Sequence, residues 1–258
     1  MPTHGQHHYE DAGGRGLPVL ALHGVFGRGL TFAALAEQLL PEYRVIAPDL
    51  RGHGLTTAAG DFSREAFVDD MAQFVEALGL APVLLYGHSL GGVTAYQLAA
   101  RRPELARAVV VEDVGAVTDE TAVAQPVLDV ADWPRHFASQ AAAAEFFATT
   151  PAPDYFLESV VDGELLFDLA TMMRVQEGNR GAWWADWEAV NCPVLLLRAT
   201  NSFLLSADQA VEMARRRPGT EQVVFEGTGH WIHREDPDGC AAAVRAFVER
   251  TTWRRRGA

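Results

Sequence analysis

Short apolar segments alternate with longer amphipathic segments along this chain. This alternation is typical of a mostly parallel, twisted sheet covered by helices on both faces, which is an α/β fold. Most of the short segments are nearly continuous apolar runs, as expected for strands that are buried on both faces. The predicted strands are residues 17–22, 44–47, 82–86, 108–111, 194–198 and 222–225.

The longer segments carry the features of helices that lie on such a sheet. The clearest predicted helix follows Ser63, because apolar residues recur at helical spacing from there through Leu78. Another is expected after Ser206, which forms a capping-box pair with Gln209. A last helix is expected after Pro237.

One stretch interrupts the alternation. From residue 117 to residue 186 no convincing strand is visible, and alanine-rich and aromatic segments are separated by prolines. We interpret residues 117–186 as a helical cap, or lid, inserted into a core domain made of residues 1–116 and 187–258. The cap is expected over the edge where the strands of the sheet end. Its aromatic residues could line a pocket or pack the cap onto the core.

Charge and composition exclude several function classes. The chain has 34 acidic and 21 basic residues and a formal net charge of −13, which argues against nucleic acid or an anionic membrane as partner. Every basic residue is an arginine, so enzymes that need a lysine amine, such as Schiff-base, pyridoxal and Walker-type enzymes, are excluded. Two cysteines are too few for a disulfide scaffold. No signal peptide and no apolar run of membrane-spanning length are visible, which predicts a cytoplasmic protein.

The segment Gly87-His88-Ser89-Leu90-Gly91 fits the pattern G-x-S-x-G. A predicted strand runs directly into it and a helix-like segment runs directly out of it. This strand–turn–helix context is that of a nucleophile elbow, a strained turn that exposes a serine oxygen at the edge of a sheet. Glycines are needed on both sides because the strand and the helix pass too closely for side chains. The context predicts Ser89 as a nucleophile.

A second glycine-containing loop, His23-Gly24-Val25-Phe26-Gly27, follows the first predicted strand. A serine nucleophile needs two backbone N–H groups that stabilise an oxyanion. The amide of Leu90, at the start of a helix, is one candidate, and the amide of Val25 is the other. The alternative interpretation of this loop is a simple glycine turn.

The base is expected to be a histidine late in the chain. His230 follows the last predicted strand by a few residues, whereas the nearby His233 is expected at the surface. The sequence also has three histidines near its start, which we expect in a flexible terminus without a partnering carboxylate cluster. No metal is therefore predicted. These three residues are His4, His7 and His8.

These motifs together resemble the α/β-hydrolase superfamily, and the resemblance covers nearly the whole chain. It rests on the His-Gly loop, on the loop from Asp49 to Gly54, on the elbow, on the lid and on the late Gly-His pair. The resemblance implies a sheet of about eight strands, a Ser-His-acid triad and no cofactor. Haloalkane dehalogenases and epoxide hydrolases of this superfamily carry an aspartate nucleophile. Because Ser89 stands at that position, both activities are disfavoured.

The triad acid departs from the family pattern. The family usually carries it after the strand that here is 194–198, at about Ser202, but no acidic residue lies between Glu188 and Asp208. Asp113 follows the strand 108–111, a position to which some family members have moved the acid. We therefore favour Asp113, with Glu112 and Asp208 as the alternatives.

The leading hypothesis is a cofactor-free serine hydrolase that cleaves a small carboxylic ester or lactone. Two alternatives remain: a carbon–carbon or amide hydrolase for a carboxylate-bearing molecule, and a non-catalytic binding protein on the same fold. A substrate carboxylate could pair with Arg28, or with Arg174 or Arg180 in the cap. The expected partner is a small molecule, and monomer and dimer are both open. The candidate substrate-binding residues are Phe26, Arg28, His88, Trp133, Phe137, Arg174, Trp184 and Trp231.

Overall fold

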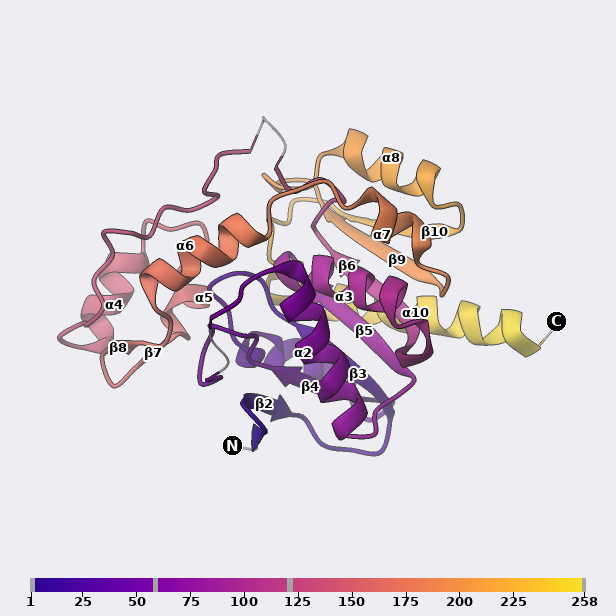
Figure 1. Ribbon diagram of the computed structural model, residues 1–258, viewed down its shortest axis with the longest axis horizontal. Helices are drawn as coiled ribbons and strands as arrows, with labels where there is room; N and C mark the ends of the chain where they lie inside the picture. The colour runs from indigo at the N-terminus through magenta and orange to yellow at the C-terminus, as the bar shows by residue number, and fades with distance from the viewer. Residues whose placement is uncertain (1–2, 58–59, 120–122, 257–258) are drawn as a thin grey trace.

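The structure is a computed structural model that describes residues 3–57, 60–119 and 123–256. Its core is an eight-stranded sheet in the order β1-β2-β4-β3-β5-β6-β9-β10. Neighbouring strands from β4 to β10 are parallel, whereas β1–β2 and β2–β4 are antiparallel. Figure 1 shows helices on both sides of this sheet, which confirms the predicted α/β class. The strands are β1 (Thr3–His4), β2 (His7–Asp11), β3 (Leu17–Leu22), β4 (Tyr43–Pro48), β5 (Val83–His88), β6 (Ala106–Glu112), β9 (Val194–Ala199) and β10 (Thr220–Phe225).

Each strand predicted from an apolar run is present, and most are longer than predicted. β5 continues through His88 and β6 continues through Glu112, because these two residues are register partners in the parallel ladder. Glu112 is in turn paired with Leu197 of β9. Polar residues at the strand ends therefore belong to the sheet, and the ladder brings these ends together at one edge.

The segment from Thr3 to Asp11 forms two strands of the sheet, contrary to the expectation that its histidines lie in a flexible terminus. β2 pairs with the edge strand β4, and His7 and His8 are both buried. His8 Nδ1 lies 3.1 Å from Oδ2 of the buried Asp49, and the His7 ring packs edge-on against Phe74. The prediction was wrong because backbone pairing with β4 and partners distant in sequence order this polar segment.

The helices divide into two layers, each over its own apolar cluster. Residues of α2 and α3 belong to the cluster on one face, and residues of α1 and α10 belong to the cluster on the other face. α2 and α8 begin at the predicted caps, since Ser63 accepts from Ala66 N and Ser206 accepts from Gln209 N. None of the helices in the described part of the chain is long and apolar enough to cross a membrane. The helices outside the chain between β6 and β9 are α1 (Ala33–Leu39), α2 (Arg64–Ala77), α3 (Leu90–Arg101), α8 (Ala207–Arg216), α9 (Ile232–Glu235) and α10 (Pro237–Arg256), with short 3-10 turns at Gly29–Phe32 and Pro103–Leu105.

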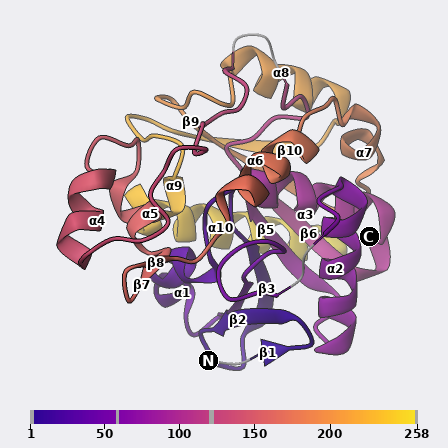
Figure 2. The ribbon, with the colours of Figure 1, turned by 60° about the vertical axis from the view of Figure 1, so that its left-hand side comes forward.

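The chain between β6 and β9 holds residues 117–186, the segment predicted as a cap, and the word cap denotes these residues. It contains α4 (Gln140–Phe147), α5 (Pro153–Leu157), α6 (Leu169–Gly178) and α7 (Trp184–Ala189). It also contains a two-stranded hairpin, β7 (Val160–Val161) and β8 (Glu164–Leu165), where no strand was expected. In Figure 2, α4, α5 and the hairpin group together, away from α7.

Helix α7 crosses the predicted cap boundary at residue 186. Its Trp187 is buried and packs edge-on against Tyr96 of the core helix α3, with ring centroids 5.6 Å apart. Residues 120–122 of the predicted cap lie outside the described residues, as do residues 1–2, 58–59 and 257–258 of the predicted core.

Candidate active site

Ser89 sits on the strained turn between β5 and α3. Its φ of 53° and ψ of −119° lie in a region that non-glycine residues rarely occupy, and α3 begins at the next residue. A Cβ atom on Gly87 would lie 2.2 Å from Gly91 O, and a Cβ atom on Gly91 would lie 2.0 Å from Leu22 O. Side chains at these positions would collide with backbone, so the two glycines of the motif permit the turn.

His230 and Asp113 form a buried hydrogen-bonded pair. His230 Nδ1 donates to Asp113 Oδ2 over 2.8 Å. The Asp113 carboxylate also accepts from Ala199 N at 3.0 Å and from the Ser202 hydroxyl. Three donors, from the end of β9 and from the loop of His230, therefore hold this carboxylate in place. In the tautomer that carries its proton on Nδ1, the His230 ring has a lone pair on Nε2.

The other two candidate acids lie elsewhere. Asp208 is exposed in the first turn of α8, where the helix dipole favours a carboxylate. Glu112 is buried, but its carboxylate binds His233. The structure thus brings Asp113, and neither alternative, to His230. Ser202 stands where the family usually has its acid, and sequence reasoning missed its hydroxyl as a hydrogen-bond donor.

The loop that carries Val25 is oriented by His23. His23 Nδ1 donates to Gly24 O over 2.7 Å, and Nε2 accepts from Leu50 N over 2.9 Å. Burial lowers the pKa of His23 to about 4, so the ring is neutral at pH 7 and keeps this tautomer. In a trans peptide the N–H points away from the preceding carbonyl, so fixing Gly24 O also fixes the direction of Val25 N–H.

The two predicted oxyanion-hole amides are available as donors. Leu90 N belongs to the first turn of α3, where amides have no partner within the helix. Within the described segments, neither Leu90 N nor Val25 N donates a hydrogen bond. The cap contributes to this loop, since Tyr155 Oη donates to Val25 O over 3.1 Å and Ser159 Oγ donates to Phe26 O over 3.0 Å.

His88 supports the segment that carries His230. Its Nε2 donates to the backbone oxygen of His230 over 3.0 Å, and the two ring centroids lie 4.4 Å apart. Burial lowers the pKa of His88 well below its ordinary value, so the ring is neutral. His88 therefore positions the loop of His230 from the side of the elbow.

A pocket of about 100 Å³ opens onto Ser89 and His230. Besides Ser89 and His230, five predicted residues line it: Val25, Phe26, His88, Arg180 and Trp231. Its wall also includes Phe203 and Leu204, which follow β9 and which sequence reasoning missed. Phe203 is 48% exposed, and its ring centroid lies 5.3 Å from that of His230. Phe203 therefore forms part of the pocket entrance.

Two of the predicted substrate-binding arginines do not line this pocket. Arg28 is buried, with its Nε 3.9 Å from Asp49 Oδ2 and an Nη1 bond to Glu158 O. Arg174 lies over the Phe62 ring at 4.9 Å. Both cations therefore have partners within the protein.

Three predicted aromatic residues also lie outside the pocket lining. Trp133 and Phe137 belong to an aromatic cluster within the cap, where both rings pack against Phe147. Trp184 lies under the guanidinium of Arg216 at 4.2 Å. These side chains pack the cap and α7, because large aromatic surfaces are buried most effectively against one another.

The cap contributes both polar and apolar residues to the pocket lining. The polar ones are Gln176, Asn179 and Arg180, at the end of α6 and just after it, together with Thr118 and Gln125. The apolar ones are Val117, Val123, Val127, Leu128, Pro151 and Phe156. Arg180 is exposed and pairs with Glu177 over 2.9 Å. The five polar residues, with Arg180 as their cation, form what we call the polar wall of the pocket.

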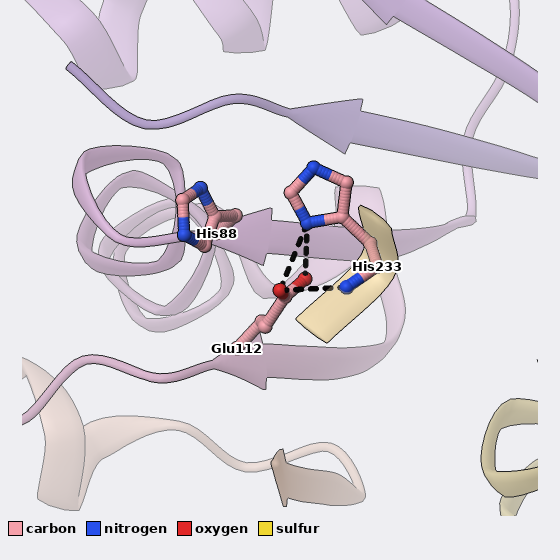
Figure 3. Close-up of side chains that lie close together, drawn as sticks. All are labelled: His88, Glu112 and His233. Atoms are coloured by element: carbon pink, nitrogen blue, oxygen red, sulfur yellow. Dashed lines mark hydrogen bonds and ion pairs between the residues drawn. The ribbon is translucent and has the colours of Figure 1, made fainter. Parts of the chain in front are cut away.

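In the part of the chain that the structure describes, one group of potential metal ligands lies close together. Atoms of His88, Glu112 and His233 lie within 4.8 Å of one another, and all three residues are buried (Figure 3). The Glu112 oxygens accept hydrogen bonds from Tyr86 Oη at 2.6 Å, from His233 N at 3.0 Å and from His233 Nδ1 at 2.8 Å. Protons already occupy the directions that a metal ion would need, so this cluster suits hydrogen bonding better than metal binding.

His233 was expected at the surface, and that expectation was wrong because the Glu112 carboxylate holds the His233 ring inside the protein.

A serine on a strained strand–helix turn at the edge of a doubly covered parallel sheet defines the class of α/β-hydrolases. The family model described as "Alpha/beta hydrolase family" matches residues 19–243, and the chain belongs to this family.

Several relatives of the chain are named as esterases or hydrolases. It is 25% identical over 237 residues to the esterase YbfF of Escherichia coli, covering 90% of this chain and 92% of the relative. It is 28% identical over 248 residues to the 2-(acetamidomethylene)succinate hydrolase of Mesorhizobium japonicum, covering 92% of this chain and 89% of the relative. The crystal structure of E-2-(acetamidomethylene)succinate hydrolase superposes with a TM-score of 0.83 at 28% identity, covering 92% of each chain. These similarities support a hydrolase in general.

Proposed function

We propose that this chain is a cofactor-independent serine hydrolase that cleaves a small carboxylic ester or lactone. Ser89 is the nucleophile, His230 the general base, Asp113 the acid of the triad, and the amides of Val25 and Leu90 form the oxyanion hole. The observation that carries this proposal is the 2.8 Å His230–Asp113 hydrogen bond beside the strained Ser89, with Ser89 and His230 lining one pocket.

The residues act in two half-reactions. His230 Nε2 removes the proton of Ser89 Oγ, which attacks the carbonyl carbon, and the negative oxygen is stabilised by the amides of Val25 and Leu90. The bond to the leaving oxygen breaks as His230 returns the proton to the alcohol. Water then attacks the acyl group, giving its proton to His230, and Ser89 leaves with that proton as the free acid departs. Asp113 stabilises the imidazolium that forms in each half-reaction.

A second candidate function is hydrolysis of a substrate that carries a free carboxylate. The observation that favours it is the polar wall around Arg180, the cation on the cap side of the pocket. A relative at 28% identity is named a hydrolase of a succinate derivative, which is a carboxylated molecule. The pocket of about 100 Å³ suits small substrates of either kind.

Replacement of the nucleophile tests the proposal most directly. In Ser89→Ala, kcat for p-nitrophenyl acetate is expected to fall by about 10⁵-fold or more, because no other group can form the acyl intermediate. Ser206→Ala, which changes a serine at the cap of α8, is the matched control and is expected to keep wild-type kcat.

A fluorophosphonate probe separates the enzyme from a binding protein on the same fold. The probe is expected to label the wild-type chain and to leave Ser89→Ala unlabelled. An unlabelled wild-type chain without esterase activity would favour the binding protein.

A further inference from the structure

Two carboxylate–histidine pairs lie next to each other at the end of β6. Asp113 and Glu112 are adjacent at the end of β6, and their partners His230 and His233 are three residues apart in the chain. Asp113, Glu112 and His233 are completely buried, and His230 is 4% exposed. The proposed triad uses one pair and leaves the other without a role.

Glu112 connects the turn of the nucleophile to the segment of the base. Its backbone oxygen accepts from Ser89 N over 3.0 Å. Its carboxylate accepts from both the backbone N and the ring Nδ1 of His233, at 3.0 Å and 2.8 Å (Figure 3). One residue thus holds both Ser89 and the helix α9, which starts two residues after His230.

The hydrogen bonds of His233 also extend to the cap. Because Nδ1 donates to Glu112, Nε2 of a neutral His233 accepts from Thr31 Oγ1 over 3.1 Å. Arg234 donates to the same Thr31 oxygen at 3.2 Å and pairs with Glu158 of the cap at 2.6 Å. The segment after His230 is thereby joined to the core on one side and to the cap on the other.

A buried carboxylate–imidazole pair is a poor source of stability, because both groups lose hydration on folding. Its geometry is nevertheless specific, since leaving either group without its partner is costly. The bond to Asp113 constrains one nitrogen of the His230 ring, but it does not constrain the main chain that follows His230. The His233–Glu112 bonds constrain that main chain.

We propose that Glu112 and His233 are positioning residues, which hold the His230 segment so that the His230 ring is aligned with Ser89 and Asp113. This inference rests on the proposed serine-hydrolase function. Misalignment of reacting groups by about 1 Å can cost about 100-fold in rate without weakening substrate binding. The pair should therefore affect kcat and leave KM nearly unchanged.

Three variants test this with p-nitrophenyl acetate. Glu112→Gln and His233→Leu are expected to lower kcat by about 10- to 100-fold with KM within about twofold of the wild type. His233→Asn retains a side-chain N–H near the position of Nδ1, so it should recover most of the activity lost in His233→Leu. Cys240→Ala is the control, because Cys240 hydrogen-bonds to Tyr86 in the same buried cluster and the variant keeps both partners of the Glu112–His233 bonds. It is expected to keep wild-type kcat.

A double-mutant cycle distinguishes positioning from general destabilisation. In an Asp113→Asn background, Glu112→Gln should lower kcat little further. The alignment of the His230 ring that Glu112 maintains no longer raises kcat once Asp113 is lost. Losses that multiply in the double mutant, or wild-type kcat in Glu112→Gln while turnover still depends on Ser89, would overturn the inference. Turnover that survives Ser89→Ala would instead contradict the proposed function itself, so the two failures are distinguishable.

Discussion

The carboxyl edge of the sheet and the cap organise their polar and aromatic residues in opposite ways. At the sheet edge, Ser89, Asp113 and Glu112 stand at the ends of adjacent strands, and nearly every polar atom of the buried carboxylates has a partner. In the cap, the aromatic residues chiefly contact one another, as Trp133 and Phe147 do, and the ion pairs are exposed.

This difference shows at which positions in the fold the residue type alone predicts whether a residue belongs to the active site. A residue at the end of a parallel strand reaches the active edge because the ladder places it there. An aromatic residue in an amphipathic insertion has many possible apolar partners, and burying its surface against other rings is as favourable as lining a pocket. Among the residues of the pocket wall in the cap, Arg180 was a candidate because of its charge. Gln176 and Asn179 lie at the end of the same helix, where the aromatic pattern gave no indication of them.

The largest expected effect tests the sheet edge. Asp113→Asn should keep the fold but lower kcat by about 10⁴-fold, because an amide favours the wrong imidazole tautomer and cannot stabilise the imidazolium. Asp208→Asn is the matched control, and it should cost only about 0.5 kcal/mol of unfolding free energy through the helix dipole. Steady-state kinetics and thermal unfolding of the two variants provide the measurement. An essential Asp208 with a dispensable Asp113 would refute the assignment of the acid.

The next effect tests whether the cap aromatics serve packing. Phe147 is completely buried among other rings, whereas its neighbour Phe146 is 37% exposed. Phe147→Ala should lower the unfolding free energy by about 3–5 kcal/mol, the usual cost of removing a buried phenylalanine. Phe146→Ala should cost clearly less in the same denaturant titration. Equal losses would show that burial in the cap does not determine these contributions.

The smallest effect tests the polar wall of the pocket. Arg180→Gln should lower kcat/KM for an ester with a free carboxylate by about tenfold, since one charge-assisted contact is lost at a partly exposed site. The rate for a neutral ester should stay the same, and so should both rates in Arg174→Gln, whose side chain lies over Phe62. A similar loss for neutral and charged esters would argue against a carboxylate-bearing substrate.

The sequence by itself determined the core of the fold and the elements of the site that depend on local structure. Apolar runs predicted the strands because both faces of a parallel sheet are buried, and the Ser63 and Ser206 caps marked helix starts because they satisfy free amides. The elbow at Ser89 was visible because glycine spacing and strand–helix context are properties of one short segment.

Only the tertiary structure decided which distant groups meet. The choice of Asp113 over Glu112 and Asp208 as the partner of His230, and the burial of His233, depend on how β6, β9 and α9 pack together. The ordered first strands likewise depend on pairing with β4. Such contacts join residues far apart in the chain, and a side chain's type and its immediate neighbours do not determine which of several equivalent partners it will contact. The physical reason is that these polar groups gain their positions from burial and hydrogen bonding in the folded core, which exist only after the strands have assembled.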